Sequence, residues 1–205
     1  MALKPELVVI AGPNGSGKTT ITRRVIQHAW GHGCLYLNPD EIAQREFGGW
    51  NSPEASFQAA RKVAQIREEY LLSEKSLMFE TVFSAPDKLE YIKKARTAGF
   101  FIRLFFICTG DPAINIRRIA RRQEEGGHTV PTEKILSRYS KSIANCAIAV
   151  ELVDRAYIYD NSVDNADPAL LFRTENGALK KVCRQPVNDW AKPIFEKARR
   201  GAFEL

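Results

Sequence analysis

One short segment, Gly12-Pro13-Asn14-Gly15-Ser16-Gly17-Lys18-Thr19, constrains the fold of this chain more than any other feature. It matches the pattern G-x-x-x-x-G-K-[ST] and follows an apolar run at residues 7–11. In such a loop, glycines let backbone N–H groups turn toward phosphate oxygens, and the helix that follows adds its dipole. The alternative is a chance glycine-rich turn, which the strand–loop–helix context disfavours. The segment predicts nucleotide binding without saying what happens to the γ-phosphate.

The individual roles within this loop follow from its chemistry. We expect Lys18 to reach the β and γ phosphates of a purine nucleoside triphosphate, and the Thr19 hydroxyl to bind Mg²⁺. The predicted nucleotide-binding residues are Gly12, Asn14, Gly15, Ser16, Gly17, Lys18, Thr19 and Thr20.

Strand-like and helix-like segments alternate along the rest of the chain, which favours right-handed crossovers and a parallel sheet. We expect strands at residues 3–11, 34–37, 76–83, 100–108 and 156–159, with helices between them. The run at 100–108 is the most apolar and should lie at the sheet centre. The pattern predicts a three-layer α/β P-loop fold with a mostly parallel five-stranded sheet.

The composition fits one domain, because 205 residues with 44% apolar side chains can bury a sizeable core. We expect a core at residues 1–165, which includes a lid at 112–131. Residues 166–205 should add a small hairpin, turning at Asn176-Gly177, and a helix. The four cysteines form no C-x-x-C pair and no apolar run is long enough for a membrane helix, so we expect a reduced, cytoplasmic protein.

Several kinds of P-loop protein are disfavoured. The chain has neither the L-S-G-G-Q-like signature of transporter ATPases nor the N-K-x-D sequence of GTPases. Asp111 follows an apolar strand loosely like a Walker B aspartate, but it directly precedes Pro112, so a helix N-cap is the better interpretation. Small-molecule kinases remain, and they need a base and arginines near the γ-phosphate.

Two predicted strand ends supply acidic candidates. Asp40 follows the second strand, at the sheet edge where ligands of such folds bind, and could accept the proton of an acceptor hydroxyl. An N-cap for residues 41–47 is an equal alternative for it. Glu80 and Thr81 end the third strand and could bind a sugar-like acceptor, or could simply face water.

The predicted helix at residues 112–125 carries four arginines, of which Arg118 and Arg122 are spaced i, i+4 on one face. Four like charges so close repel one another unless an anion or acidic partners intervene. A Gly126-Gly127-His128 turn follows, so helix and turn are typical of a lid over a triphosphate. A solvated charged face is the alternative, and His128 could be an ordinary loop histidine. Asp160-Asn161-Ser162, after the last strand, could border the adenine or form a plain turn.

The ordered set of these motifs resembles the zeta-toxin family of P-loop kinases over roughly residues 5–165. The motifs are the phosphate loop, Asn38-Pro39-Asp40, Phe79-Glu80-Thr81, the arginine helix, the segment 126–131, Arg138-Tyr139 and Tyr159-Asp160-Asn161-Ser162. The resemblance implies an adenylate-kinase-like fold with ATP as donor. In the best-known members it implies phosphorylation of the amino sugar of UDP-N-acetylglucosamine.

Carried onto this chain, the resemblance implies that Lys18 and Thr19 hold phosphate and Mg²⁺ and that Asp40 is the general base. Glu80 and Thr81 match the acceptor-binding strand end, and Arg118 and Arg122 match the lid arginines best. We also expect His128 to bind the acceptor. This chain has Gly-Gly-His where the larger toxins place a second arginine. A protein antitoxin is implied by analogy only.

Two other functions stay open. The formal charge of +6 and the arginine cluster would fit an ATP-dependent nucleic-acid end-processing kinase. However, no basic strip is interleaved with base-stacking aromatics. A non-catalytic nucleotide-sensing module would keep the loop without turnover, which the intact Lys18, Thr19 and Asp40 disfavour.

Overall fold

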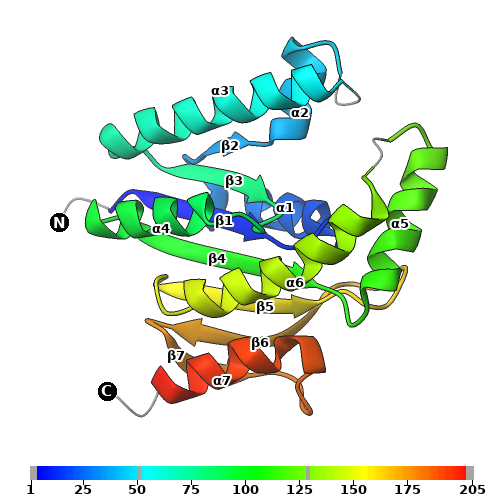
Figure 1. Cartoon of the computed structure of the whole chain (residues 1–205). Coiled ribbons are helices and arrows are strands. Elements are labelled where there is room, and N and C mark those ends of the chain that lie inside the picture. Colours follow the sequence, from blue (N-terminus) through cyan, green and yellow to red (C-terminus); the bar gives the residue numbers. More distant parts are fainter. Residues whose placement is uncertain (1–3, 50–51, 128–129, 202–205) are drawn as a thin grey trace.

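The fold was analysed in a computed structural model that describes residues 4–49, 52–127 and 130–201 (Figure 1). Within these residues one sheet has the strand order β2-β3-β1-β4-β5-β6-β7. The strands are β1 Glu6–Ala11, β2 Leu35–Leu37, β3 Leu77–Thr81, β4 Phe101–Cys108, β5 Arg155–Asp160, β6 Ala169–Glu175 and β7 Ala178–Val182. The helices are α1 Lys18–Gln27, α2 Pro39–Glu46, α3 Pro53–Leu72, α4 Asp87–Thr97, α5 Pro112–Glu124, α6 Thr132–Ala149 and α7 Lys192–Gly201, with short 3₁₀ turns η1 Ala29–Gly31 and η2 Asp189–Ala191.

The first five strands run parallel, and β4 lies at the centre of the sheet, as its apolar sequence predicts. Helices cover both faces, so strand residues are apolar on both sides. In β1, for example, Leu7 and Val9 belong to one hydrophobic cluster, and Val8 and Ile10 belong to another.

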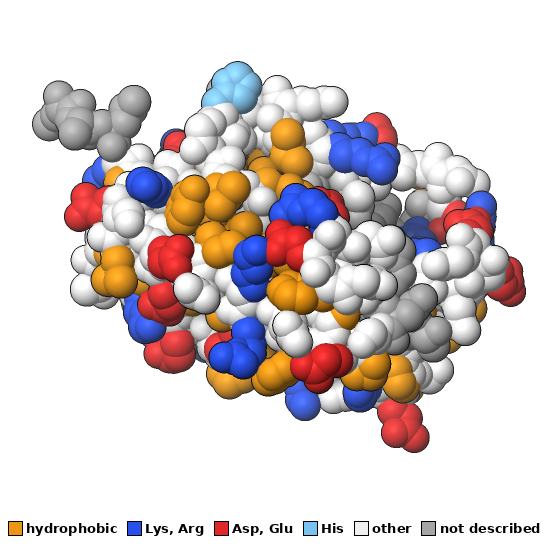
Figure 2. Space-filling model, turned by 90° about the horizontal axis from the view of Figure 1, so that it is seen from above, with side chains coloured by type: hydrophobic (Ala, Val, Ile, Leu, Met, Phe, Trp, Pro, Cys, Tyr) orange, Lys and Arg blue, Asp and Glu red, His pale blue; other side chains and the backbone are white. Residues whose placement is uncertain are grey.

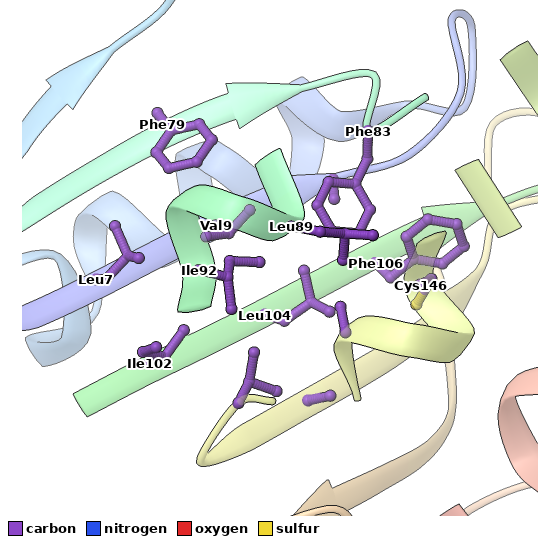
Figure 3. Packing of buried hydrophobic residues seen from close by; sticks show 14 of the residues in the cluster. Leu7, Val9, Phe79, Phe83, Leu89, Ile92, Ile102, Leu104, Phe106 and Cys146 are labelled. Atoms are coloured by element: carbon purple, nitrogen blue, oxygen red, sulfur yellow. The ribbon is translucent and has the colours of Figure 1, made fainter. Parts of the chain in front are cut away.

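The larger cluster lies between the sheet and the helices drawn in front of it in Figure 1, among them α4 and α6. Figure 3 shows Phe79, Val9 and Leu104 from three neighbouring strands beside Ile92 of α4 and Cys146 of α6. The smaller cluster packs α1 against the opposite face, where the rings of Phe105 and Tyr157 stack with centroids 4.8 Å apart.

The prediction of five strands is wrong, because the C-terminal hairpin joins the sheet and raises the number of strands to seven. β6 pairs antiparallel with β5, and β7 pairs with β6. The hairpin turn itself is confirmed, since Asn176 and Gly177 both have positive φ, 51° and 80°. Pairing with β6 satisfies the backbone N–H and C=O groups of β5 that would lack partners if β5 were the edge strand.

The C-terminal segment is also bound through one carboxylate at the end of β5. Asp160 Oδ2 accepts hydrogen bonds from Asn188 Nδ2 at 2.9 Å and from Trp190 Nε1 at 3.2 Å. The last helix begins at Lys192, directly after the 3₁₀ turn η2.

All four cysteines are free, and two of them, Cys108 and Cys146, are buried. Among the residues described here, no helix is both long and apolar enough to cross a membrane.

Because β4 is central, its inward side chains should carry much of the stability. We expect Phe106→Ala, at a site with no solvent exposure, to lower the free energy of unfolding by about 3–5 kcal/mol in urea titrations. Phe57→Ala is the control, since Phe57 is 60% exposed on α3 and should cost less than about 1 kcal/mol. Equal losses in the two variants would contradict this assignment of the core.

Candidate functional site

The predicted phosphate loop connects β1 to α1, and its glycines are required by close contacts. Gly12 and Gly17 have φ of 150° and 91°. A Cβ on Gly12 would lie 2.0 Å from the Ile107 carbonyl oxygen, and one on Gly17 would lie 2.1 Å from Asn161 Nδ2. The loop is therefore locked against β4 and the end of β5.

The start of α1 is open to an anion. Gly17 is the N-cap and gives no side-chain hydrogen bond to the helix. Ser16 Oγ, within the loop, is buried without a hydrogen-bond partner. A helix N-terminus with unfilled donors and an orphaned hydroxyl fits a bound phosphate group.

The ammonium group of Lys18 lies beneath this loop. Its Nζ donates to the Gly12 carbonyl at 2.9 Å and to the Pro13 carbonyl at 3.2 Å. An ammonium has three donors, so one remains for a phosphate oxygen. Burial lowers the pKa of Lys18, the charges of Glu80 and Asp40 raise it, and Arg122 lowers it further. Glu80, Asp40 and Arg122 all border the same cavity as Lys18.

Asp40 is placed by the first turn of α2. The helix is capped by Asn38, whose Oδ1 accepts the Asp40 backbone N–H at 3.0 Å, and Pro39 is its first residue. The alternative role of Asp40 as an N-cap is wrong, because Asn38 fills that position. The Asp40 carboxylate is exposed and lines the cavity described below.

Glu80, at the end of β3, is fixed by two hydroxyl groups. Thr22 Oγ1 donates to Glu80 Oε1 at 2.6 Å, and the Tyr36 hydroxyl donates to the same oxygen at 2.7 Å. Burial and the neighbouring Glu80 raise the pKa of Tyr36, which keeps that hydroxyl a donor. The hydroxyl of Thr81 is turned to the backbone, where it accepts the Phe83 N–H at 3.0 Å.

The arginine helix α5 is anchored on the phosphate loop by a buried amide. Asn115 Nδ2 donates to the Asn14 carbonyl at 2.6 Å, and Asn115 Oδ1 accepts from Thr109 Oγ1. Asp111 caps this helix, as predicted, with its Oδ1 2.8 Å from the Ala113 nitrogen. The first turns of the predicted lid therefore pack on the nucleotide-binding loop.

Acidic partners relieve the repulsion expected among the four arginines. Asp164 accepts from Arg117 Nη2 at 3.0 Å and from Arg118 Nε at 2.8 Å. These two guanidinium groups lower the pKa of Asp164. Arg121 pairs with Glu125.

A cavity of about 610 Å³ collects these groups at the carboxyl edge of the sheet. It is bordered by Gly15, Gly17, Lys18, Thr19, Asp40, Glu80, Thr81, Arg118 and Arg122. A second cavity of about 460 Å³ shares Gly17 and Arg118 with the first and is bordered also by Thr20, Arg117, Asn161 and the loop 163–166. Asn161 also donates to the Ser16 carbonyl at 2.8 Å. Of the residues predicted for the site, Asp40, Glu80, Thr81, Arg118 and Arg122 border the larger cavity together with Lys18 and Thr19, whereas Thr20 borders the second cavity. His128 lies outside the described residues.

Four further polar residues had no role in the sequence-based prediction of the site. Arg138 of α6 lines the larger cavity, and its Nη1 donates to Asn14 Oδ1 at 3.3 Å. Arg67 of α3 and Lys88 of α4 line it too. Asn115 anchors α5, as described. Of these four residues, only Arg138 could have been noticed in the sequence, because the pair Arg138-Tyr139 is one of the motifs shared with the family.

A divalent cation would find few protein ligands here. No group of three or more His, Cys, Asp or Glu side chains capable of holding a metal occurs among the described residues. Thr19 is exposed at the mouth of the loop. This fits Mg²⁺, which takes one or two protein ligands together with substrate phosphates.

Comparison with known proteins gives one family match and several structural relatives. The family model described as zeta toxin matches residues 2–176. An uncharacterized protein of Haemophilus influenzae is 26% identical over 137 residues, which are 67% of this chain and 94% of that protein.

Two solved structures show the same fold. The first comes from a study of the PezAT toxin–antitoxin system of Streptococcus pneumoniae and has a TM-score of 0.65 with 16% identity, covering 100% of this chain and 89% of that chain. The second, AvrRxo1-ORF1 with AvrRxo1-ORF2 and ATP, has a TM-score of 0.64 with 17% identity and covers 96% of this chain and 64% of that chain.

Because Lys18 is the cation inside the loop, Lys18→Met should remove stabilisation by ATP·Mg²⁺. At about 100 times the dissociation constant, ATP should add about 2.7 kcal/mol to the wild-type unfolding free energy. Lys192→Met, at an exposed lysine of α7, should keep this gain. Urea titrations with and without ATP measure this gain in unfolding free energy. If Lys18→Met gained as much from ATP as the wild type, the role of Lys18 would be refuted.

The lowered pKa of Lys18 also predicts a pH effect in the nucleotide-free protein. Between that lowered pKa and the ordinary value of 10.5, the unfolded chain holds a proton that the folded chain has released. The unfolding free energy should therefore rise with pH in this alkaline window. Lys18→Met should show a smaller rise in the same urea titrations, and parallel curves for the two proteins would contradict the burial of the charge.

Proposed function

This chain belongs to the zeta toxin family, and we propose that it is an ATP-dependent phosphotransferase that transfers the γ-phosphate to a hydroxyl of a small acceptor. The observation that carries the proposal is a single cavity bordered by the phosphate loop, two carboxylates and arginines from α5 and α6. Phosphoryl transfer depends mostly on positioning and on stabilisation of charge, and these groups supply both.

The donor triphosphate binds at the start of α1. The loop N–H groups and the dipole of α1 receive the phosphates, and the free donor of Lys18 bonds a β or γ oxygen. Thr19 would hold Mg²⁺ through its hydroxyl, and the ion would supply positive charge beside the triphosphate. We assign the nucleoside to the second cavity, which is also bordered by Gly17.

The acceptor binds in the part of the larger cavity next to Asp40 and Glu80. Asp40 takes the proton of the attacking hydroxyl as its oxygen bonds to the γ-phosphorus. The bond between that phosphorus and the oxygen bridging to the β-phosphate breaks, and ADP leaves. Both hydrogen bonds to Glu80 end on Oε1, and we assign Oε2 to a second acceptor hydroxyl.

Three guanidinium groups stabilise the charge that develops on the transferred phosphoryl group. Arg122 and Arg138 border the cavity, and Arg138 touches the loop at Asn14. Arg118 borders it as well but is paired with Asp164. We propose that the triphosphate draws Arg118 from this pair, since phosphate and carboxylate compete for the same guanidinium fork.

A UDP-amino-sugar such as UDP-N-acetylglucosamine is the acceptor that we propose, on the strength of family membership and the match of Asp40 and Glu80 to its motifs. A protein antitoxin is a further proposed partner, because the similar PezAT structure comes from a toxin–antitoxin system.

A nucleic-acid end-processing kinase is less well supported. On the face seen in Figure 2, basic and acidic side chains are interspersed around apolar ones, so this face offers no continuous basic track. Three of the α5 arginines are also paired with Asp164 or Glu125. A non-catalytic sensor would not need Asp40 and Glu80 in one cavity with Lys18.

The proposed activity can be tested without knowing the acceptor. Protein with ATP·Mg²⁺ should convert UDP-N-acetylglucosamine, or another hydroxyl compound in a metabolite extract, into a species heavier by one phosphate, as seen by mass spectrometry. Protein with Lys18→Met is the control. Tight ATP binding without any new phosphorylated species would reject the kinase proposal.

The role of the base has its own test. Asp40→Asn should lower the rate of transfer by roughly 10²–10⁴-fold because the amide cannot accept the proton. ATP affinity should stay the same. Glu41→Gln, one residue along the same exposed helical turn, should retain the rate. Unchanged turnover in Asp40→Asn would remove Asp40 from the mechanism.

A further inference from the structure

The hydroxyl group of Tyr36 connects the two segments that carry the carboxylates of the site. Tyr36 of β2 pairs in register with Met78 of β3, and Glu80 lies two residues further along, on the same face of the sheet. The Tyr36 ring packs with Met78 in the smaller hydrophobic cluster, and its hydroxyl donates to Glu80 Oε1 at 2.7 Å. Asn38 and Glu80 border the larger cavity, so Tyr36 acts on the cavity through them.

The same hydroxyl accepts a hydrogen bond from the residue that caps α2. Asn38 Nδ2 donates to the Tyr36 oxygen at 3.1 Å and to Glu41 Oε1 at 3.3 Å. Asn38 Oδ1 accepts the backbone N–H of Asp40. Because both hydrogens of the amide nitrogen and the amide oxygen have partners, the Asn38 side chain is held in one orientation. A chain of hydrogen bonds therefore runs from the backbone of Asp40 through Asn38 and Tyr36 to Glu80.

The direction of this chain is set by the proton of Tyr36. Burial and the charge of Glu80 raise the pKa of Tyr36, so its hydroxyl stays protonated. A phenol has a single hydrogen, which it gives to Glu80, and its oxygen is then left to accept from Asn38. A phenylalanine at position 36 would fill the same space and break both connections.

Glu80 is held from a second side by Thr22. Thr22 Oγ1 donates to the same Oε1 atom at 2.6 Å. Thr22 is 2% exposed and lies on α1, four residues after Lys18. Thr22 thus fixes Glu80 relative to the helix of the phosphate loop, whereas Tyr36 fixes it relative to α2.

From this arrangement we infer that Tyr36 is a positioning residue for transfer, because it holds the base Asp40 and the acceptor-binding Glu80 in one frame. The inference rests on the proposed function and adds a residue to it. A base must lie within hydrogen-bond reach of the attacking hydroxyl, and a misplacement of about 1 Å can cost about 10²-fold in rate. Without the Tyr36 hydroxyl, the two carboxylates would move independently.

Three conservative variants separate the connections. Tyr36→Phe removes the bonds to both Asn38 and Glu80. Thr22→Val removes a hydroxyl from Glu80 and leaves α2 untouched. Asn38→Ser keeps the cap of α2, because serine caps helices about as well as asparagine, but it removes the donor to Tyr36. Initial rates with UDP-N-acetylglucosamine, or with the acceptor found in the metabolite extract, give kcat and the KM of each substrate.

Tyr36→Phe should lower kcat about tenfold or more and raise the KM of the acceptor, while the KM of ATP stays within about twofold. Asn38→Ser should mainly lower kcat, since it acts through α2 and Asp40. Thr22→Val should mainly raise the KM of the acceptor. Tyr70→Phe, at a partly buried tyrosine that packs against the larger hydrophobic cluster, is the control and should match the wild type.

Two kinetic results would overturn the inference and leave the kinase proposal standing. A Tyr36→Phe enzyme with the wild-type kcat would show that the hydroxyl positions nothing needed for transfer. If Thr22→Val lowered kcat as much as Tyr36→Phe does, the effect would come from Glu80 alone and the connection to α2 would be rejected.

Double-mutant cycles measure the same connections without any transfer. Urea titrations give the unfolding free energies of Tyr36→Phe combined with Glu80→Met, and of Tyr36→Phe combined with Asn38→Ser. In each pair the two losses should be less than additive, because both changes remove the same bond. Glu151→Gln, at an exposed carboxylate paired with Lys197, should be additive with Tyr36→Phe. Additive losses in either test pair would overturn the inference alone, whereas a wild type that transfers no phosphate would reject the kinase and this inference with it.

Discussion

A buried ammonium group beneath a glycine-rich loop is the interaction on which the site depends. Lys18 is held by the carbonyl oxygens of Gly12 and Pro13, which fixes its position but does not neutralise its charge. Glu80 and Asp40 compensate part of the cost of burial. A triphosphate would complete this compensation, because it brings the negative charge to the one remaining donor of the ammonium.

The topology of the sheet explains why the other groups meet at this ammonium. β3 pairs with β1, and β2 pairs with β3, so Glu80 and the start of α2 lie beside the phosphate loop. On the other side, β4 leads to α5, whose Asn115 is bonded to the loop at Asn14. Acidic groups therefore approach from one side of β1 and arginines from the other. The proposed transfer would use the carboxylate as base and the arginines to stabilise charge on the phosphoryl group.

The sequence predicts the parts of this site that follow directly from strand ends. The loop motif, Asp40 and Glu80 each come immediately after or at the end of a buried strand, so their place at one edge follows from a parallel sheet. Arg118 and Arg122 follow from helical spacing together with the loop that precedes their helix.

Other features depend on how distant segments pack, which a sequence pattern does not contain. Arg67 lies in the last half of a 20-residue helix with many polar residues, and only the contact of α3 with Phe79 and Tyr91 turns it toward the cavity. The seven-stranded sheet likewise depends on the pairing of β6 with β5, across the loop that contains Asp164. Asn38 and Asp40 flank the same proline, and both are residue types that cap helices well. The sequence therefore does not choose between them, and the structure shows that Asn38 is the cap.

The most direct measurement of the central claim is a crystal structure with Mg²⁺ and a non-hydrolysable ATP analogue. The account predicts that Lys18 Nζ lies about 3 Å from a β or γ phosphate oxygen, that Asp40 faces the γ-phosphorus, and that Arg122 approaches the same phosphate. A triphosphate bound elsewhere, or one with Asp40 and Arg122 turned away from its γ-phosphate, would contradict it.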